Sequence, residues 1–141
     1  MAGIIYAPAK KRLFYSYGKN LAFEVNDGKK IILECKKKNN NEIIVLENSG
    51  NTPDKILEIY KKNKVTKKIK MSSSLKFCVL ASGEADIYAA TARACEWDIA
   101  AGHAILKNAG GNVTDFEGNE ILYGKKDFKN PSLILKSKNI L

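Results

Sequence analysis

The chain lacks any apolar run of the roughly 20 residues that a membrane-spanning helix needs. Its first residues carry no charged stretch ahead of an apolar one, so they do not resemble a secretory signal. Cysteine is scarce: Cys35, Cys78 and Cys95 have neither a CxxC spacing nor a metal-site spacing, and three thiols cannot all pair. We therefore expect free thiols in a cytoplasmic protein without a transmembrane segment, with peripheral attachment to the inner membrane face left open.

Acidic residues and histidine are also few. The 15 Asp and Glu residues face 24 Lys and Arg residues, and the single histidine leaves a formal net charge of +9. A basic surface can bind nucleic acid or another anion. Because no aromatic residues alternate with the lysine clusters and no recognition helix is evident, we expect solvated lysines and no nucleic-acid partner. The 141 residues are enough for one compact domain with its own core.

The most informative stretch is EWDIAAGH at residues 96–103. Apolar residues continue from it at helical spacing and end at Gly110-Gly111, which places Asp98 at the start of a predicted helix. Unpaired amides and a partial positive charge at a helix N-terminus keep a carboxylate ionised. Asp98 is therefore a candidate cation ligand, and the alternative is that it only caps its helix. Magnesium needs several oxygen ligands, and the chain offers this one good candidate.

Other polar side chains near this stretch invite functional interpretations that we do not favour. His103 could serve as a general base on the same helix, but a partly buried structural histidine is the interpretation that we prefer. Asp86 and Asp115 lie in predicted strand or turn positions, and we expect them to be structural. Glu96 has no predicted role.

The order of strands and helices predicts the fold class. Short strand patterns and tight turns over residues 3–35 predict an antiparallel sheet. From residue 42 onward strands and helices alternate, which predicts a layered α/β arrangement. The predicted strands cover residues 3–7, 13–17, 21–25, 30–34, 42–46, 65–71, 85–88, 113–116 and 132–136, and residues 89–96 are ambiguous. Three helices are predicted, one capped by Thr52, one at 75–81 capped by serines, and one opening near Asp98.

The polar segment 36–41 predicts a division of the chain. We expect residues 1–36 to be an antiparallel β remnant of an N-terminal domain and residues 42–141 to be a C-terminal α/β domain. The N-terminal sheet has too few helices of its own to cover it. It therefore either packs on the second half or binds a partner outside this chain.

Eight motifs occur in an order that points to one family. They are GIIYAP at 3–8, GKNLAF at 18–23, SSLKFC at 73–78, EADIY at 84–88, EWDIAAGH at 96–103, GG at 110–111, TDFEG at 114–118 and NP at 130–131. Together they resemble the inositol monophosphatase-like superfamily over nearly the whole chain, and within it the bacterial 3'(2'),5'-bisphosphate nucleotidases. The resemblance implies the layered α-β-α-β sandwich of that superfamily. It also implies a Mg²⁺-dependent phosphatase that removes the 3'-phosphate of 3'-phosphoadenosine 5'-phosphate.

The resemblance also implies which residues form the site. Asp98 would be the magnesium ligand, and Asp98, Ser73, Ser74 and Lys76 would bind the substrate. Hydroxyls and amides ahead of a helix suit a phosphate, and Lys76 adds positive charge. The alternative is a serine-capped surface helix with a solvated lysine.

The same resemblance indicates what the chain does not contain. Family members are about twice as long, and their N-terminal half carries a glutamate on a helix and an Asp-Pro-x-Asp-Gly-Thr loop, neither of which occurs here. We therefore expect no complete catalytic set and no activity from the isolated chain, which would be a complementing half of a split enzyme or a non-catalytic remnant. The expected partners are a phosphate ester resembling adenosine bisphosphate, and either a separately encoded N-terminal half or a second copy in a homodimer. Inositol monophosphatase-type activity is the alternative.

One loop departs from the family pattern. Between Tyr88 and Glu96, relatives commonly carry a loop like Pro-Arg-Phe-Gly-Pro-Thr, whereas this chain has AATARAC at 89–95. Arg93 lies nearer to Asp98 along the chain than the usual arginine would. Without its prolines and glycine, the loop is predicted to be looser or partly helical, which bears on substrate recognition.

Overall fold

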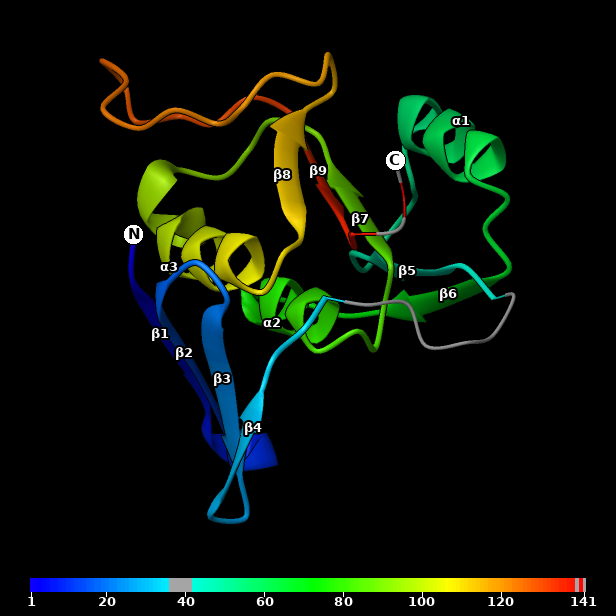
Figure 1. Ribbon diagram of the computed structural model, residues 1–141. Helices are drawn as coiled ribbons and strands as arrows, with labels where there is room; N and C mark the ends of the chain where they lie inside the picture. Colours follow the sequence, from blue (N-terminus) through cyan, green and yellow to red (C-terminus); the bar gives the residue numbers. More distant parts are fainter. Residues whose placement is uncertain (36–41, 139, 141) are drawn as a thin grey trace.

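The computed structural model describes residues 1–35, 42–138 and 140. These residues fold into four layers in which sheets and helices alternate (Figure 1). An antiparallel sheet of β1 to β4, here called the N-terminal sheet, packs on α2 and α3. The other side of the helix pair packs on a mixed sheet of β5 to β9, the C-terminal sheet, and α1 covers its far face. The predicted α/β sandwich is confirmed.

The N-terminal sheet is a meander in the order β1-β2-β3-β4, as its turn chemistry predicts. The strands are β1 (Gly3–Ala7), β2 (Arg12–Gly18), β3 (Leu21–Asn26) and β4 (Lys29–Ile32). A single 3₁₀ turn, Pro8–Lys10, joins β1 to β2. Asn20, Asp27 and Gly28 adopt positive φ angles of 61°, 47° and 74°, which suit these residue types at tight hairpin turns.

The two faces of the N-terminal sheet differ in burial. On the inner face Phe14 and Ala22 are completely buried in the core shared with α2 and α3. The outer face leaves Ile4 65%, Tyr6 59% and Ile32 62% exposed. The sheet thus packs on the second half of the chain through one face, while its other face presents exposed apolar side chains to solvent.

The C-terminal sheet has the order β6-β5-β7-β9-β8. Its strands are β5 (Ile44–Glu47), β6 (Lys67–Lys70), β7 (Ile87–Ala90), β8 (Asn112–Asp115) and β9 (Leu133–Lys136). β6, β5 and β7 run parallel, while β9 is antiparallel to both β7 and β8. Helix α1 (Asp54–Lys62) buries Ile56 and Tyr60 against one face of this sheet.

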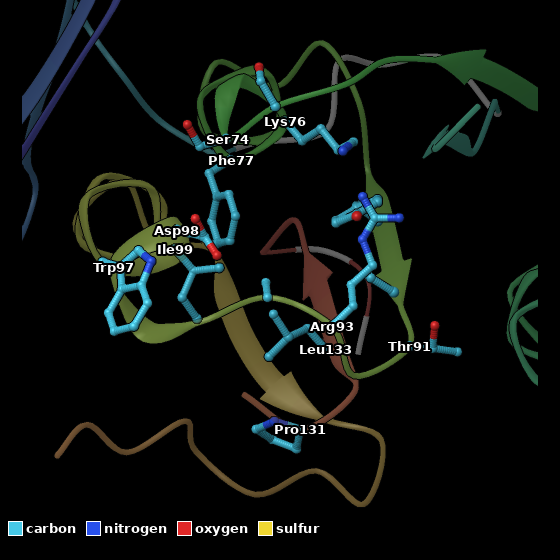
Figure 2. Close-up of a pocket in the computed structure, with 14 residues that line it drawn as sticks. Ser74, Lys76, Phe77, Thr91, Arg93, Trp97, Asp98, Ile99, Pro131 and Leu133 are labelled. Atoms are coloured by element: carbon cyan, nitrogen blue, oxygen red, sulfur yellow. The ribbon is translucent and has the colours of Figure 1, made fainter. Parts of the chain in front are cut away.

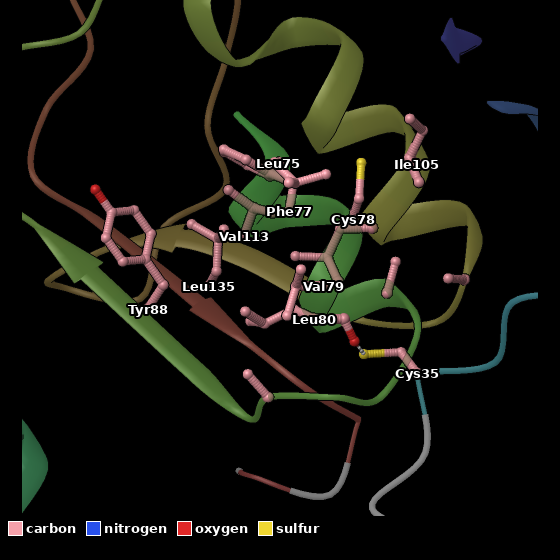
Figure 3. Close-up of a cluster of buried hydrophobic side chains, with 14 of the residues drawn as sticks. Cys35, Leu75, Phe77, Cys78, Val79, Leu80, Tyr88, Ile105, Val113 and Leu135 are labelled. Carbon is pink, nitrogen blue, oxygen red and sulfur yellow. Dashed lines mark hydrogen bonds between the residues drawn. The ribbon is translucent and has the colours of Figure 1, made fainter. Parts of the chain in front are cut away.

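Helices α2 (Leu75–Ala81) and α3 (Glu96–Asn108) lie between the two sheets. All seven residues of α2 are buried, and Figure 3 shows five of their side chains, Leu75, Phe77, Cys78, Val79 and Leu80, in the core with side chains of β7, β9 and α3. Gly102 permits the helices to approach closely, because a Cβ there would lie 2.6 Å from the Phe77 Cγ. The Cys35 thiol reaches this core and donates a hydrogen bond to the Leu80 carbonyl at 3.1 Å.

Several local predictions need correction. The Thr52 hydroxyl does not cap α1, because Pro53 is the N-cap and the hydroxyl donates to Glu47 instead. The serine contact at the start of α2 comes from Ser73, whose Oγ accepts a hydrogen bond from the Leu75 amide, while Ser74 at the N-cap position makes no side-chain bond. β7 lies two residues later than the predicted strand at 85–88, and the segment 91–94 that follows it is not helical.

Other predictions fall outside what the structure tests. The predicted linker at 36–41 lies outside the described residues. The division into residues 1–36 and 42–141 stays a prediction, and side chains from both parts share one core. Among the described residues, no helix combines the length and the apolar character that crossing a membrane requires.

Candidate active site

A cavity of about 590 Å³ opens beside the end of β7. Its walls come from the start of α2, the loop at 91–95, the start of α3 and the beginning of β9 (Figure 2). All four predicted site residues, Ser73, Ser74, Lys76 and Asp98, line this one cavity. The structure therefore brings together residues from two helices that are separated by more than twenty positions in the sequence.

Asp98 is exposed to the cavity and also stabilises the start of α3. The helix begins at Glu96 with Cys95 as its N-cap, so Asp98 is the third helical residue. Its Oδ2 accepts a hydrogen bond of 2.8 Å from the Cys95 amide, which is half of a capping box. No other hydrogen bond reaches this carboxylate within the described residues. Helix capping and cation binding are thus compatible, because one oxygen caps the helix and the other accepts no hydrogen bond from the residues that the structure describes.

Ser73 and Ser74 form the edge of the cavity ahead of α2. Ser73 has a positive φ of 68°, and its Oγ accepts a hydrogen bond of 3.3 Å from the Leu75 amide. Ser74 makes no side-chain capping bond, so its hydroxyl is available to a ligand. Their roles in substrate binding stay predictions.

Lys76 is not a solvated surface lysine, because only 5% of the residue is exposed. Its Nζ lies 4.5 Å from the centroid of the Tyr88 ring, a cation–π contact. Burial, and to a smaller extent the positive charge of Arg93, lower the pKa of Lys76 to about 8. The ammonium group is therefore poorly solvated and lies close to a second cation.

Three further polar side chains line the cavity, Tyr88, Thr91 and Arg93, and none of them was among the predicted site residues. The Tyr88 hydroxyl exchanges hydrogen bonds with Asn48, and burial raises the pKa of Tyr88. Arg93 is the only charged residue between 89 and 95, and its nearness to Asp98 along the chain was the sequence signal that pointed to it. Tyr88 carries no such signal, because its position in the cavity follows from how β7 pairs with its neighbours.

Glu96 has a role that the sequence did not predict. Its carboxylate accepts hydrogen bonds from the amides of Gly124 at 2.9 Å and Lys125 at 3.0 Å, and it pairs with the Lys125 ammonium at 2.6 Å. The Lys125 side chain and these two amides lower the pKa of Glu96 to about 2. Glu96 thus fastens the long connection between β8 and β9 to the start of the helix that carries Asp98.

His103 does not line the cavity. It is 3% exposed, and its Nδ1 lies 2.8 Å from the Tyr123 hydroxyl. Burial lowers the pKa of His103 to about 4, so the ring is neutral at pH 7. Asp86 and Asp115 are also engaged in local hydrogen bonds, Asp86 with Ile44 and Ser137 and Asp115 with Asn119. These contacts agree with the structural roles expected for all three residues.

The residues present do not by themselves fit a magnesium ion. Across residues 1–35, 42–138 and 140, no three His, Cys, Asp or Glu side chains group closely enough to hold a metal. Among the described residues that line the cavity, Asp98 is the single carboxylate. Because Mg²⁺ requires close to octahedral oxygen coordination, Asp98 can contribute one ligand and the others must come from other groups.

The family described as "Inositol monophosphatase family" matches residues 1–140. The chain therefore belongs to the inositol monophosphatase family. It is 33% identical over 131 residues to the 3'(2'),5'-bisphosphate nucleotidase CysQ of Salmonella typhimurium, covering 92% of this chain and 52% of that protein. It is 40% identical over 122 residues to the CysQ of Buchnera aphidicola, covering 86% of this chain and 45% of that protein.

The solved structures agree with the sequence relatives. The crystal structure of CysQ from Bacteroides thetaiotaomicron, a bacterial member of the same family, superimposes with a TM-score of 0.85 at 28% identity. The match covers 99% of this chain and 58% of that one. The chain thus spans about half the length of the nucleotidases that it matches.

Proposed function

We propose that this chain supplies one part of a Mg²⁺-dependent phosphatase that removes the 3'-phosphate of 3'-phosphoadenosine 5'-phosphate. The observation that carries the proposal is the single cavity in which Asp98 meets Ser73, Ser74 and Lys76. A carboxylate for a cation and a buried lysine for an anion on one wall suit a metal-bound phosphate ester. The nucleotidase relatives support the choice of substrate.

In this proposal each residue has a defined task. Asp98 supplies one carboxylate oxygen to the magnesium site and is oriented by its bond to the Cys95 amide. Lys76 offers positive charge from a poorly hydrated position. The Ser73 and Ser74 hydroxyls can donate to phosphate or ribose oxygens at the edge of the cavity.

The isolated chain is expected to be inactive, because one carboxylate does not satisfy Mg²⁺. The test measures inorganic phosphate released from 3'-phosphoadenosine 5'-phosphate with excess Mg²⁺, and inositol 1-phosphate is the competing substrate. The chain alone should show no metal-dependent turnover. The chain mixed with an N-terminal polypeptide from a nucleotidase relative should release phosphate from the nucleotide in preference to the inositol ester.

The matched variant for this assay is Asp98→Asn, which keeps the shape of the side chain and removes its charge. The reconstituted activity should fall by at least about a hundredfold, since loss of a metal ligand removes electrostatic stabilisation of that order. Turnover by the pure chain, or a reconstituted activity that survives Asp98→Asn, would contradict the proposal.

A second candidate function is that of a binding partner for another polypeptide. The outer face of the N-terminal sheet favours it. There Tyr15 and Phe23 stack at 5.3 Å, the Lys30 ammonium lies 4.1 Å from the Phe23 ring, and Ile4 and Tyr6 stay more than half exposed. An apolar face of this kind is typical of an interface. The complementing polypeptide, rather than a second copy, is our proposed occupant, because two chains of charge +9 would repel each other.

Size-exclusion chromatography with light scattering distinguishes these partners. We expect a monomer in isolation and a one-to-one complex with the N-terminal polypeptide. Tyr6→Lys should weaken that complex without affecting Asp98. A stable homodimer that Tyr6→Lys disrupts would instead assign the face to self-association.

A further inference from the structure

Within the part of the chain that the structure describes, the two sheets end in four edge strands. These are β1 and β4 in the N-terminal sheet and β6 and β8 in the C-terminal sheet. An edge strand has unpaired N–H and C=O groups on one side, and these groups can pair with a strand of another chain. Proteins commonly prevent such pairing with lysines along the edge or with a segment that covers it. The four edges of this chain differ in that protection.

Three of the edges are protected. β4 has the sequence KKII and β6 the sequence KKIK, so lysines line both strands. Thr114 of β8 pairs with β9 and also with Glu120, which therefore covers part of the free edge of β8. Charge at two edges and a covering segment at the third discourage pairing with another chain.

β1 has none of these features. Its sequence GIIYA contains no charged residue. The strand pairs with β2 in unbroken register from Gly3 to Ala7, and the described residues make no other backbone hydrogen bond to it. The side chains of Ile4 and Tyr6 are more than half exposed. β1 is therefore a regular, uncharged edge whose backbone is paired on one side only.

The position of β1 indicates what could pair with it. The start of the strand lies beside α3, as Figure 1 shows. The Gly3 backbone packs so closely on this helix that a Cβ on Gly3 would collide with the Ala101 carbonyl group. Ala101 is three residues after Asp98, which is about one helical turn. A polypeptide that adds a strand to β1 is thus near the carboxylate that needs further oxygen ligands to hold Mg²⁺.

We propose that β1 accepts a β-strand from the N-terminal polypeptide that complements this chain, so that the N-terminal sheet continues across the interface. The inference rests on the proposed function for the identity of the partner. It adds the mode of binding, in which main-chain hydrogen bonds along β1 supplement the contacts on the outer face of the sheet.

Two observations favour this partner over a second copy of the chain. The chain covers about half of the nucleotidase relatives, so their remaining residues include enough sequence for such a strand. A polypeptide that brings further acidic ligands for Mg²⁺ is attracted by a chain of charge +9, whereas a second copy is repelled.

The first test is hydrogen–deuterium exchange of the full chain, read by NMR. The chain is measured alone and in complex with the N-terminal polypeptide of the Buchnera aphidicola relative, produced by co-expression. The β1 amides that point away from β2 should exchange at least about tenfold more slowly in the complex, because each then donates a hydrogen bond. The amides of β4, at the opposite edge of the same sheet, should keep the exchange rates of the free chain.

Ile4→Lys and Ile32→Lys form a matched pair of variants for the second test. The two isoleucines are 65% and 62% exposed, and the strand registers place them in one cross-strand row with Tyr15 and Phe23. Ile4→Lys puts a charge on the proposed pairing edge and should weaken binding of the polypeptide at least about tenfold. Ile32→Lys adds a charge to an edge that already carries lysines, and it should weaken binding much less.

Binding of the immobilised polypeptide measures both variants, and far-UV circular dichroism checks that each is folded. Equal weakening by the two substitutions would mean that the partner covers the face of the sheet without adding a strand, and it would overturn the proposal. The absence of a complex, or a complex in which the β1 amides stay unprotected, would also overturn it. Protection of β1 that appears without the polypeptide and increases with the concentration of the chain would assign the edge to a second copy instead.

The same measurements separate this inference from the proposed function. Protected β1 amides in a complex that releases no phosphate leave strand addition standing and refute the phosphatase. Phosphate release that is lost in Asp98→Asn, from a complex whose β1 amides are unprotected, refutes strand addition alone.

Discussion

The Arg12 guanidinium joins the N-terminal sheet to the connection between α2 and β7. Its Nη2 donates to Glu24 Oε2 at 2.9 Å while Nε donates to the other oxygen, and Nη1 donates to Glu84 at 3.3 Å. Only 6% of the Glu24 side chain and 15% of the Arg12 side chain are exposed. The planar guanidinium also lies 4.9 Å from the Phe14 ring. Arg12 thus neutralises a carboxylate that is buried at the inner face of the sheet.

Arg12→Met should destabilise the fold strongly, because it leaves the Glu24 carboxyl group buried without its partner. Removal of one member of a buried pair costs about 3–5 kcal/mol. Since 1 kcal/mol shifts the unfolding midpoint of a domain of this size by about 3 °C, the expected fall is about 10–15 °C. The double variant Arg12→Met with Glu24→Met should recover a large part of the loss, because no buried charge remains.

Urea unfolding followed by far-UV circular dichroism measures these differences as free energies of unfolding. The matched control is Lys68→Met, which breaks a pair with Glu47 in which the lysine side chain is 48% exposed. That variant should cost less than about 1 kcal/mol. If Arg12→Met costs no more than Lys68→Met, or if the double variant is no more stable than Arg12→Met, then the pair does not act as a neutralised buried charge.

Three further predictions concern the surroundings of the cavity. The pKa of Glu96 is lowered to about 2, so its contribution to stability should be present above pH 4.5 and disappear as the pH falls towards 2. In the Glu96→Gln variant, the thermal unfolding midpoint should therefore decrease less between pH 4.5 and pH 2 than it does in the unmodified protein. The pKa of His103 is lowered to about 4, so NMR should show a neutral ring at pH 6. The free energy of unfolding should decrease as the pH falls from 6.5 through 4, because the unfolded chain binds the proton more readily than the folded one. An NMR titration midpoint near 6.5 would contradict the argument that burial lowers this pKa. Gly102→Ala should lower the free energy of unfolding in urea by about 1–3 kcal/mol, because the added Cβ would lie 2.6 Å from the Phe77 Cγ. This cost should outweigh the better helix propensity of alanine. A more stable variant would mean that α2 and α3 separate easily.

The elements of the fold were predictable where the information is local. Asn26-Asp27-Gly28 specifies a tight turn because these residues tolerate a positive φ, and the hairpin of β3 and β4 follows from it. The helical spacing after Asp98 likewise predicts α3 from its own residues. The predicted Thr52 cap of α1 was wrong because the Thr52 hydroxyl donates to Glu47, a nearby residue at the end of β5, while Pro53 takes the N-cap position.

The candidate site was predictable to the extent that motifs carry it. Asp98 and Lys76 were identified from the motifs that contain them, and both line the cavity. The burial of Lys76 and its proximity to Arg93 could not be inferred, because both depend on how β7 and the following loop lie against α2. The same holds for Glu96, whose partners at 124 and 125 are distant in sequence.

The sequence by itself determined the order of strands and helices, the family and the single carboxylate at position 98, because turn chemistry, periodicity and motifs depend on residues that are close together in the sequence. Only the tertiary structure decided which face of the N-terminal sheet is buried and which cations share a wall with Asp98. These features depend on long-range packing between elements, in which burial and charge are set by residues that the chain brings together only when it folds.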